Sequence, residues 1–146
     1  MARVLVIEDG REYEEFAAAF LADRFDVVAA HSAEEALRAM AREPVEALLI
    51  DLRFERASAD ELVGDVAATA ARLFSGDEVR ALRWLKDQQG TLILGRLREA
   101  GHHQPAVFVH DFPARRLRNL RRMYGRVSAV PTFDAAAIAR ALSEPA

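Results

Sequence analysis

The sequence predicts an α/β fold, in which helices cover a parallel sheet, and three observations lead to that prediction. Short and almost uninterrupted apolar runs recur along the chain, as in strands that are buried on both faces. Segments with apolar residues at helical spacing separate these runs, which is the alternation typical of βαβ units. Two of the runs end abruptly in carboxylates, at the edge where open α/β sheets carry their functional groups.

Five segments are expected to be strands. The clearest is residues 45–51, which reads V-E-A-L-L-I-D and ends in Asp51. The other four are, in chain order, residues 3–7, 25–30, 106–109 and 126–130. Connections between such strands are right-handed crossovers, which make the sheet parallel.

Helices are expected between the strands. The apolar face of the first helix consists of Tyr13, Phe16, Ala17, Phe20 and Leu21. A capping box of Ser32 and Glu35 opens the second helix, and Pro44 separates that helix from the strand at 45–51. Further helices are expected around Leu117 and around Ile138, after the last two strands.

An extra helical insertion is expected at about residues 53–89, directly after the third strand. A second capping box, Ser58 with Glu61, predicts the start of one helix there, and Asp77 predicts the start of another. A further helix is expected over residues 91–100. The helix pair could form a lid, offer an apolar face to a partner, mediate self-association, or simply pack on the domain.

Length and composition exclude several classes of protein. The 146 residues are enough for a single domain, spanning residues 1–146, without stabilising crosslinks. The chain has no cysteine and no apolar run of membrane-spanning length, which predicts a soluble cytoplasmic protein that does not contact a membrane. The net charge of -3 argues against direct binding of nucleic acid by the whole surface.

Acidic residues follow two of the expected strands. Glu8 and Asp9 come after the first strand, and Asp51 ends the third. If these strands are neighbours, three carboxylates meet at one edge of the sheet. Carboxylate oxygens suit a hard cation such as Mg²⁺, which binds through one or two carboxylates together with waters and phosphate oxygens. The simpler alternative is that the first pair caps a helix and that Asp51 only ends a strand.

In these positions the chain resembles the receiver domains of two-component response regulators. Their acidic pair matches Glu8 and Asp9 in R-V-L-V-I-E-D-G, and their phosphoacceptor aspartate matches Asp51 in L-L-I-D-L. Their glycine ahead of the third helix matches Gly90, and their lysine-proline pair falls on residues 130–131. The resemblance covers nearly the whole chain apart from the insertion. It implies a flavodoxin-like, doubly wound sheet with strand order 2-1-3-4-5.

The resemblance also implies roles for individual residues and partners. Asp51 would be the phosphoacceptor, and Mg²⁺ would be held by Glu8, Asp9, Asp51 and the backbone carbonyl of Arg53. Pro131 is a candidate cis-proline. The expected partners are proteins, either a sensor kinase or a downstream effector, with a second copy of the chain in a homodimer as a further candidate. The domain itself is expected to be regulatory and not an enzyme.

Three positions depart from the family pattern. His110 stands in place of a serine or threonine, Val130 in place of the lysine, and Val127 in place of the aromatic switch residue. Losing the lysine removes a charge-assisted contact worth about 1.5 to 3 kcal/mol. His110 either donates a hydrogen bond, carries a pH-dependent charge, or only fills space; Arg53 either replaces the lost charge or is solvated.

These departures leave two functions open. The first is an atypical receiver in signal transduction, with an acidic magnesium pocket and phosphorylation at Asp51. The alternative is a pseudo-receiver that docks proteins independently of phosphorylation, through the insertion or the arginine-rich segment at 115–122. A small hydrolase is disfavoured because the sequence has neither a phosphate-binding glycine loop nor a nucleophile elbow, and because Arg53 stands where a second acid would be needed. Flavodoxin-like cofactor binding is disfavoured because the loop after the first strand is acidic.

Overall fold

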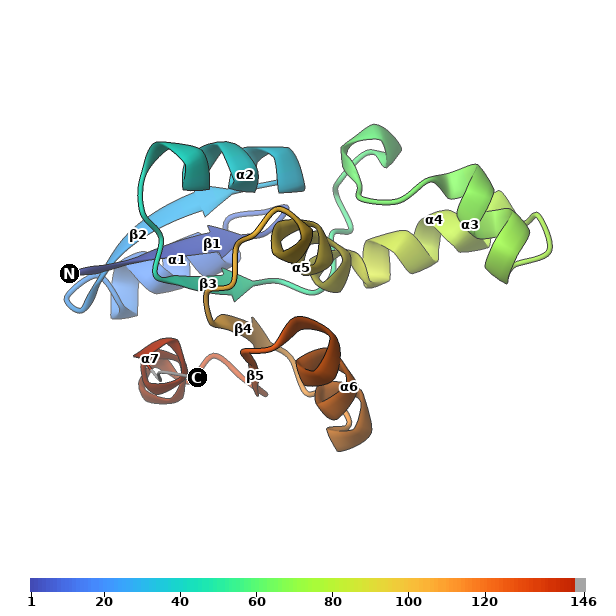
Figure 1. The fold of residues 1–146 in the computed structure, drawn as a ribbon. Coiled ribbons are helices and arrows are strands. Elements are labelled where there is room, and N and C mark those ends of the chain that lie inside the picture. Colours follow the sequence, from blue (N-terminus) through green and yellow to red (C-terminus); the bar gives the residue numbers. More distant parts are fainter. Residues whose placement is uncertain (144–146) are drawn as a thin grey trace.

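A computed structural model describes residues 1–143 and contains one five-stranded parallel sheet (Figure 1). The strands are β1 (Ala2–Ile7), β2 (Phe25–Ala30), β3 (Ala47–Ile50), β4 (Ala106–Val109) and β5 (Val127–Val130). Their order across the sheet is β2-β1-β3-β4-β5, and every neighbouring pair is parallel. The predicted fold class and strand order are therefore confirmed.

Helices follow each strand. They are α1 (Glu12–Phe20), α2 (Ala33–Arg42), α3 (Val66–Leu73), α4 (Glu78–Asp87), α5 (Gln89–Glu99), α6 (Ala114–Tyr124) and α7 (Ala135–Ser143), with a short 3-10 turn, η1, at Ala59–Glu61. None of the helices within residues 1–143 is long and apolar enough to cross a membrane.

Both faces of the sheet are covered, which explains the continuous apolar runs. Side chains alternate along a strand, so Leu5 and Ile7 of β1 pack with α2, α5 and α6, whereas Val4 and Val6 pack with α1 and α7. All four side chains are buried. A central strand in such a sheet has no polar face to display.

The strand register places the candidate acids side by side. Ile7 of β1 pairs with Ile50 of β3, and the backbone N–H of Asp51 donates to the carbonyl of Ile7 at 2.9 Å. Glu8 and Asp51 therefore leave the sheet at the same level. They do so at the carboxyl edge, toward the side of the molecule on which α3 and α4 extend in Figure 1.

The insertion is a helical hairpin between β3 and α5. Helices α3 and α4 pack against each other and project beyond the sheet, where Figure 1 shows them in green and yellow. Gln89 ties the base of the hairpin together: its amide oxygen accepts the N–H of Val63 at 2.6 Å, and its amide nitrogen donates to the carbonyls of Val63 and Leu85. This buried glutamine was not anticipated from the sequence.

One expected helix start is wrong. The capping box of Ser58 and Glu61 is present, but it caps the start of the short turn η1 and not of a longer helix. Gly64 then adopts a φ of 109°, in the left-handed region that interrupts a helix, and α3 begins after Asp65, which accepts the N–H of Ala68 at 2.8 Å. The start of α5 also differs from the expectation. This helix begins at Gln89, two residues earlier than expected.

Candidate functional site

The candidate site is a pocket of about 290 Å³ at the carboxyl edge of the sheet. Its lining combines acidic, basic and aromatic side chains, among them Asp9, Tyr13, Asp51, Arg53, Arg56 and Phe133. The position follows from topology, because side chains after parallel strands gather at one edge of the sheet.

Asp51 lies in this pocket with few internal partners. Its Oδ1 accepts hydrogen bonds from the Tyr13 hydroxyl at 3.3 Å and from the backbone N–H of Arg53 at 3.4 Å, and both bonds are long. Burial raises the pKa of Asp51 to about 6, and the negative charge of Asp9 adds to this effect. The folded protein therefore disfavours ionisation of Asp51.

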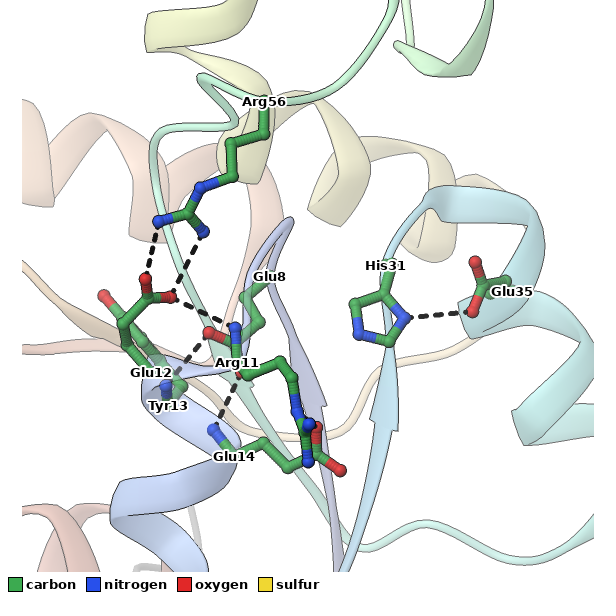
Figure 2. Close-up of polar contacts among 8 residues, drawn as sticks. All are labelled: Glu8, Arg11, Glu12, Tyr13, Glu14, His31, Glu35 and Arg56. Carbon is green, nitrogen blue, oxygen red and sulfur yellow. Dashed lines mark hydrogen bonds and ion pairs between the residues drawn. The ribbon is translucent and has the colours of Figure 1, made fainter.

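Glu8 caps a helix. It is fully buried, and its two oxygens accept the backbone N–H groups of Tyr13 at 2.9 Å and Glu14 at 2.8 Å, as Figure 2 shows. These N–H groups belong to the first turn of α1, where Arg11 at the N-cap position supplies no side-chain bond. Burial raises the pKa of Glu8 in spite of the two hydrogen bonds.

The three acids do not converge on a single point. Within residues 1–143 there is no group of three or more histidine, cysteine, aspartate or glutamate side chains placed to hold one metal ion. The two oxygens of Glu8 are engaged by α1, whereas Asp9 and Asp51 both line the pocket. The expected cluster of three carboxylates is thus reduced to a pair.

The first residues of the insertion fold back over the acids. The backbone N–H of Arg56 donates to Asp9 Oδ2 at 2.6 Å, and its guanidinium binds Glu12 with a shortest distance of 2.7 Å (Figure 2). The hydrogen bond from Arg56 lowers the pKa of Glu12 to about 2. Arg53 lies in the same lining, so two arginines stand beside the acids. Sequence reasoning missed Arg56, because no local pattern reveals the path of this loop.

Tyr13 connects several parts of the site. Its hydroxyl lies 3.3 Å from Asp51 Oδ1 and 3.2 Å from the carbonyl oxygen of Val109, and its ring meets Phe133 edge-on at 4.9 Å. Burial and the charge of Asp51 raise its pKa, so the hydroxyl keeps its proton. Sequence reasoning assigned Tyr13 only to the apolar face of a helix. Its place one turn after the acidic pair was the available signal.

The β4–β5 side of the same edge carries His110 and the exposed Asp111 after β4, and Val130 at the end of β5. The backbone N–H of His110 donates to the carbonyl of Val130 at 3.0 Å, and its ring meets Phe112 edge-on. Burial lowers the pKa of His110, and the charges of nearby arginines add to this effect, which disfavours a cationic histidine at neutral pH. Val127 and Val130 are buried in the core.

Two further positions from the sequence motif have clear outcomes. A side chain at Gly90 would place its Cβ 2.2 Å from the carbonyl oxygen of Asp51, so α5 approaches the end of β3 too closely for any other residue. The expectation of a cis bond at Pro131 is wrong, because residues 1–143 contain no cis peptide bond. The bond before Pro131 keeps the trans form, which is the default even for proline.

Comparison of the structure with solved structures gives close agreement in fold. A two-component response regulator from Clostridium difficile matches with a TM-score of 0.62 and 10% identity, covering 96% of this chain and 91% of its own. A response regulator receiver domain protein from Clostridium thermocellum matches with a TM-score of 0.61 and 14% identity, covering 97% and 91%. The chemotaxis protein CheY4 of Vibrio cholerae matches with a TM-score of 0.62 and 15% identity, covering 97% and 96%.

Sequence comparison gives no such match. No protein-family model matches the chain, and no curated protein matches it in sequence. Identities of 10 to 15% are too low to transfer individual residue roles, so the agreement concerns the fold. Over nearly its full length, the chain has the fold of response regulator receiver domains.

Proposed function

We propose that this chain is an atypical receiver domain of a signalling system and that Asp51 is its phosphoacceptor. The observation that carries the proposal is the environment of Asp51. It follows the central strand β3, lines an open pocket with Asp9, and has a pKa raised to about 6 by burial. A carboxylate with only two long hydrogen bonds keeps lone pairs free for attack on phosphorus.

The pocket fits Mg²⁺ through two carboxylates. Burial is the main reason for the raised pKa of Asp51, and the negative charge of Asp9 adds to it; a divalent cation would relieve that repulsion between the two carboxylates. They would hold the ion together with the backbone carbonyl of Arg53, while Glu8 fixes the start of α1 behind them. When bound, the cation would offset the negative charge of an incoming phosphodonor.

The response to phosphorylation would be unusual. Neither His110, whose pKa is lowered, nor the buried Val127 and Val130 offers a charge to a phosphoryl group. The groups that remain beside Asp51 are the Tyr13 hydroxyl and the side chains of Arg53 and Arg56. We therefore assign the output to protein partners that sense this altered site or the surfaces next to it.

A second candidate is a pseudo-receiver that docks proteins whether or not Asp51 is modified. It is favoured by the internal partners of the acids, since Glu8 caps α1 and Asp9 accepts a 2.6 Å hydrogen bond from Arg56. Acids that are already bound within the chain have less need of a metal ion. The two candidates differ in one measurable property, which is whether Asp51 forms an acyl phosphate.

Intact-mass analysis after incubation with acetyl phosphate and Mg²⁺ tests the proposal. An Asp51 oxygen would attack the phosphorus, the bond from phosphorus to the acetyl oxygen would break, and acetate would leave. We expect one phosphoryl adduct on the wild-type chain and none on Asp51→Asn. Glu55→Gln, which removes another acid from the pocket lining, is the matched control and should keep the adduct. A wild-type chain without adduct would overturn the phosphoacceptor role and leave the pseudo-receiver.

A further inference from the structure

A second cavity, of about 500 Å³, lies between α5 and α6, away from the acidic pocket. Leu92 from α5 and Leu120 and Met123 from α6 give it an apolar lining, and Arg115 and Arg116 line it as well. Met123 is 65% exposed, so its apolar side chain is available to a partner. The cavity therefore combines apolar surface with positive charge.

Contacts between α5 and α6 keep this groove in place. Tyr124, at the end of α6, packs so closely on Gly95 of α5 that a Cβ there would lie 2.9 Å from the tyrosine hydroxyl. The Arg98 side chain of α5 also donates to the carbonyl oxygen of Tyr124 at 2.9 Å. The two helices are thus held together at one end, and the groove does not depend on a mobile loop.

Helix α6 carries an unbalanced positive charge. Its sequence, A-R-R-L-R-N-L-R-R-M-Y, holds five arginines and no acidic residue. None of these arginines forms a salt bridge with a carboxylate of residues 1–143. Five unpaired like charges on one helix repel each other, which disfavours the isolated helix.

Arg116 shows what kind of group is missing. Its side chain is partly buried at the groove, where it stacks over the Phe112 ring at 5.3 Å and bonds the amide oxygen of Gln88. Burial lowers its pKa, because no carboxylate of residues 1–143 offsets the loss of water around the guanidinium. A carboxylate from outside the chain would supply the partner that the groove lacks.

We propose that the α5–α6 groove docks an acidic amphipathic segment of a partner protein. Apolar side chains of that segment would cover Leu92, Leu120 and Met123, and its carboxylates would pair with Arg115 and Arg116. Methionine adapts its shape to varied partners, which suits Met123 to such a contact. Docking in the groove does not require phosphorylation of Asp51. It goes beyond the phosphoacceptor role, and it names the docking surface and the partner chemistry that the pseudo-receiver candidate leaves open.

The lining favours a protein segment over a nucleic acid. A sugar-phosphate backbone would satisfy the arginines but would leave the apolar side chains of the groove uncovered. An acidic peptide with apolar residues at helical spacing matches both properties of the groove.

Fluorescence anisotropy with a defined probe tests the proposal. The probe is a labelled synthetic peptide with leucine at helical spacing and glutamate elsewhere, titrated with the full chain at moderate salt. Arg115→Glu should weaken binding by about tenfold, because like charges then face each other across the groove. Arg118→Glu is the matched control: it changes the same charge on the same helix, outside the groove lining, and should weaken binding by less than about threefold.

Further measurements distinguish binding in the groove from simple charge attraction. Met123→Gln should weaken binding of the leucine peptide, and a peptide with glutamine in place of leucine should not bind. Asp51→Asn should bind like the wild type, so the outcome is independent of the phosphoacceptor test. Equal losses in Arg115→Glu and Arg118→Glu, or no binding of the probe, would overturn the proposal. So would tighter binding of duplex DNA, or self-association of the chain that Arg115→Glu abolishes.

Discussion

The carboxyl edge of the sheet has two halves with opposite character. After β1 and β3 it carries Glu8, Asp9 and Asp51, whereas after β4 and β5 it carries His110, the exposed Asp111 and the buried Val130. The acidic half has the groups that would bind a cation and accept a phosphoryl group. In the function proposed above, the other half would lack the serine or threonine and the lysine that the resemblance to receiver domains implies for reading that change.

The hydrogen bonds of the three acids determine which of them remains available for chemistry. Glu8 is committed to α1 by two hydrogen bonds, and Asp9 accepts a 2.6 Å bond from the backbone of Arg56. Asp51 has only bonds of 3.3 and 3.4 Å, and burial raises its pKa to about 6. The acidic half therefore combines two structural carboxylates with one that is poorly stabilised.

Glu8→Ala should have the largest effect on stability. The change leaves two N–H groups at the start of α1 without an acceptor in a buried setting, which should lower the free energy of unfolding by about 3 kcal/mol. Urea unfolding measures the difference. Glu14→Ala is the control, because Glu14 makes only a 3.9 Å ion pair with Arg11, and it should cost less than about 1 kcal/mol. Equal losses would refute the capping role of Glu8.

Asp51→Asn should stabilise the protein at neutral pH. The raised pKa means that the folded state holds the Asp51 proton more tightly than the unfolded state, so ionisation costs stability as the pH rises from about 4 to about 6. Raising a pKa from 3.8 to about 6 corresponds to about 3 kcal/mol, and solvent screening and the lost hydrogen bonds reduce the expected gain to about 2 kcal/mol.

Urea unfolding at a series of pH values, with a chelator present, measures this gain. The difference between Asp51→Asn and the wild type should be near zero well below pH 3.8, where Asp51 is protonated in both states, and should reach its full size above pH 6. A gain that is constant across this range would show that the charge of Asp51 is not its cause.

The positions of the acids in the acidic half could largely be predicted from the sequence, for a physical reason. A strand buried on both faces must be apolar throughout, so the apolar run in residues 45–51 predicts both the strand and the acid that ends it. The matched glycine, Gly90, was also informative, because only glycine fits where α5 meets the end of β3. Patterns of this kind follow from local geometry, whereas the strand order was expected from the resemblance to receiver domains.

Contacts between segments that are distant in the sequence could not be predicted in this way. Arg56 reaches Asp9 across 47 positions, and Gln89 bonds Val63 across 26, without any periodic signal. The polar role of Tyr13 depends on how α1 is rotated against the sheet, which apolar spacing alone does not specify. The helix start predicted from the capping box at Ser58 was wrong for a related reason. A cap defines where a turn begins and not how far a helix continues.

Val130→Lys would restore a positive charge to the apolar half of the edge. An ammonium group near Asp51 should lower the pKa of that carboxyl from about 6 to about 5, since opposite charge favours the ionised form. NMR titration of the side-chain carboxyl carbon measures the pKa. Val127→Lys is the matched control, because Val127 lies on the same strand at the end away from Asp51. An unchanged pKa in Val130→Lys would mean that the two halves of the edge are electrostatically separate.

Tyr13→Phe should have the smallest effect and tests the link between the halves. The hydroxyl of Tyr13 is the one side-chain group of residues 1–143 with hydrogen-bond contacts to both Asp51 and the β4 end at Val109. Its hydrogen bond favours the ionised carboxylate, so removing it should raise the pKa of Asp51 above 6 and cost about 1 kcal/mol of stability or less. Tyr124→Phe, which removes the other tyrosine hydroxyl of the chain, should leave the titration of Asp51 unchanged. A titration that is the same in Tyr13→Phe and the wild type would show that Asp51 does not sense β4 through Tyr13, and the acidic half would then act alone.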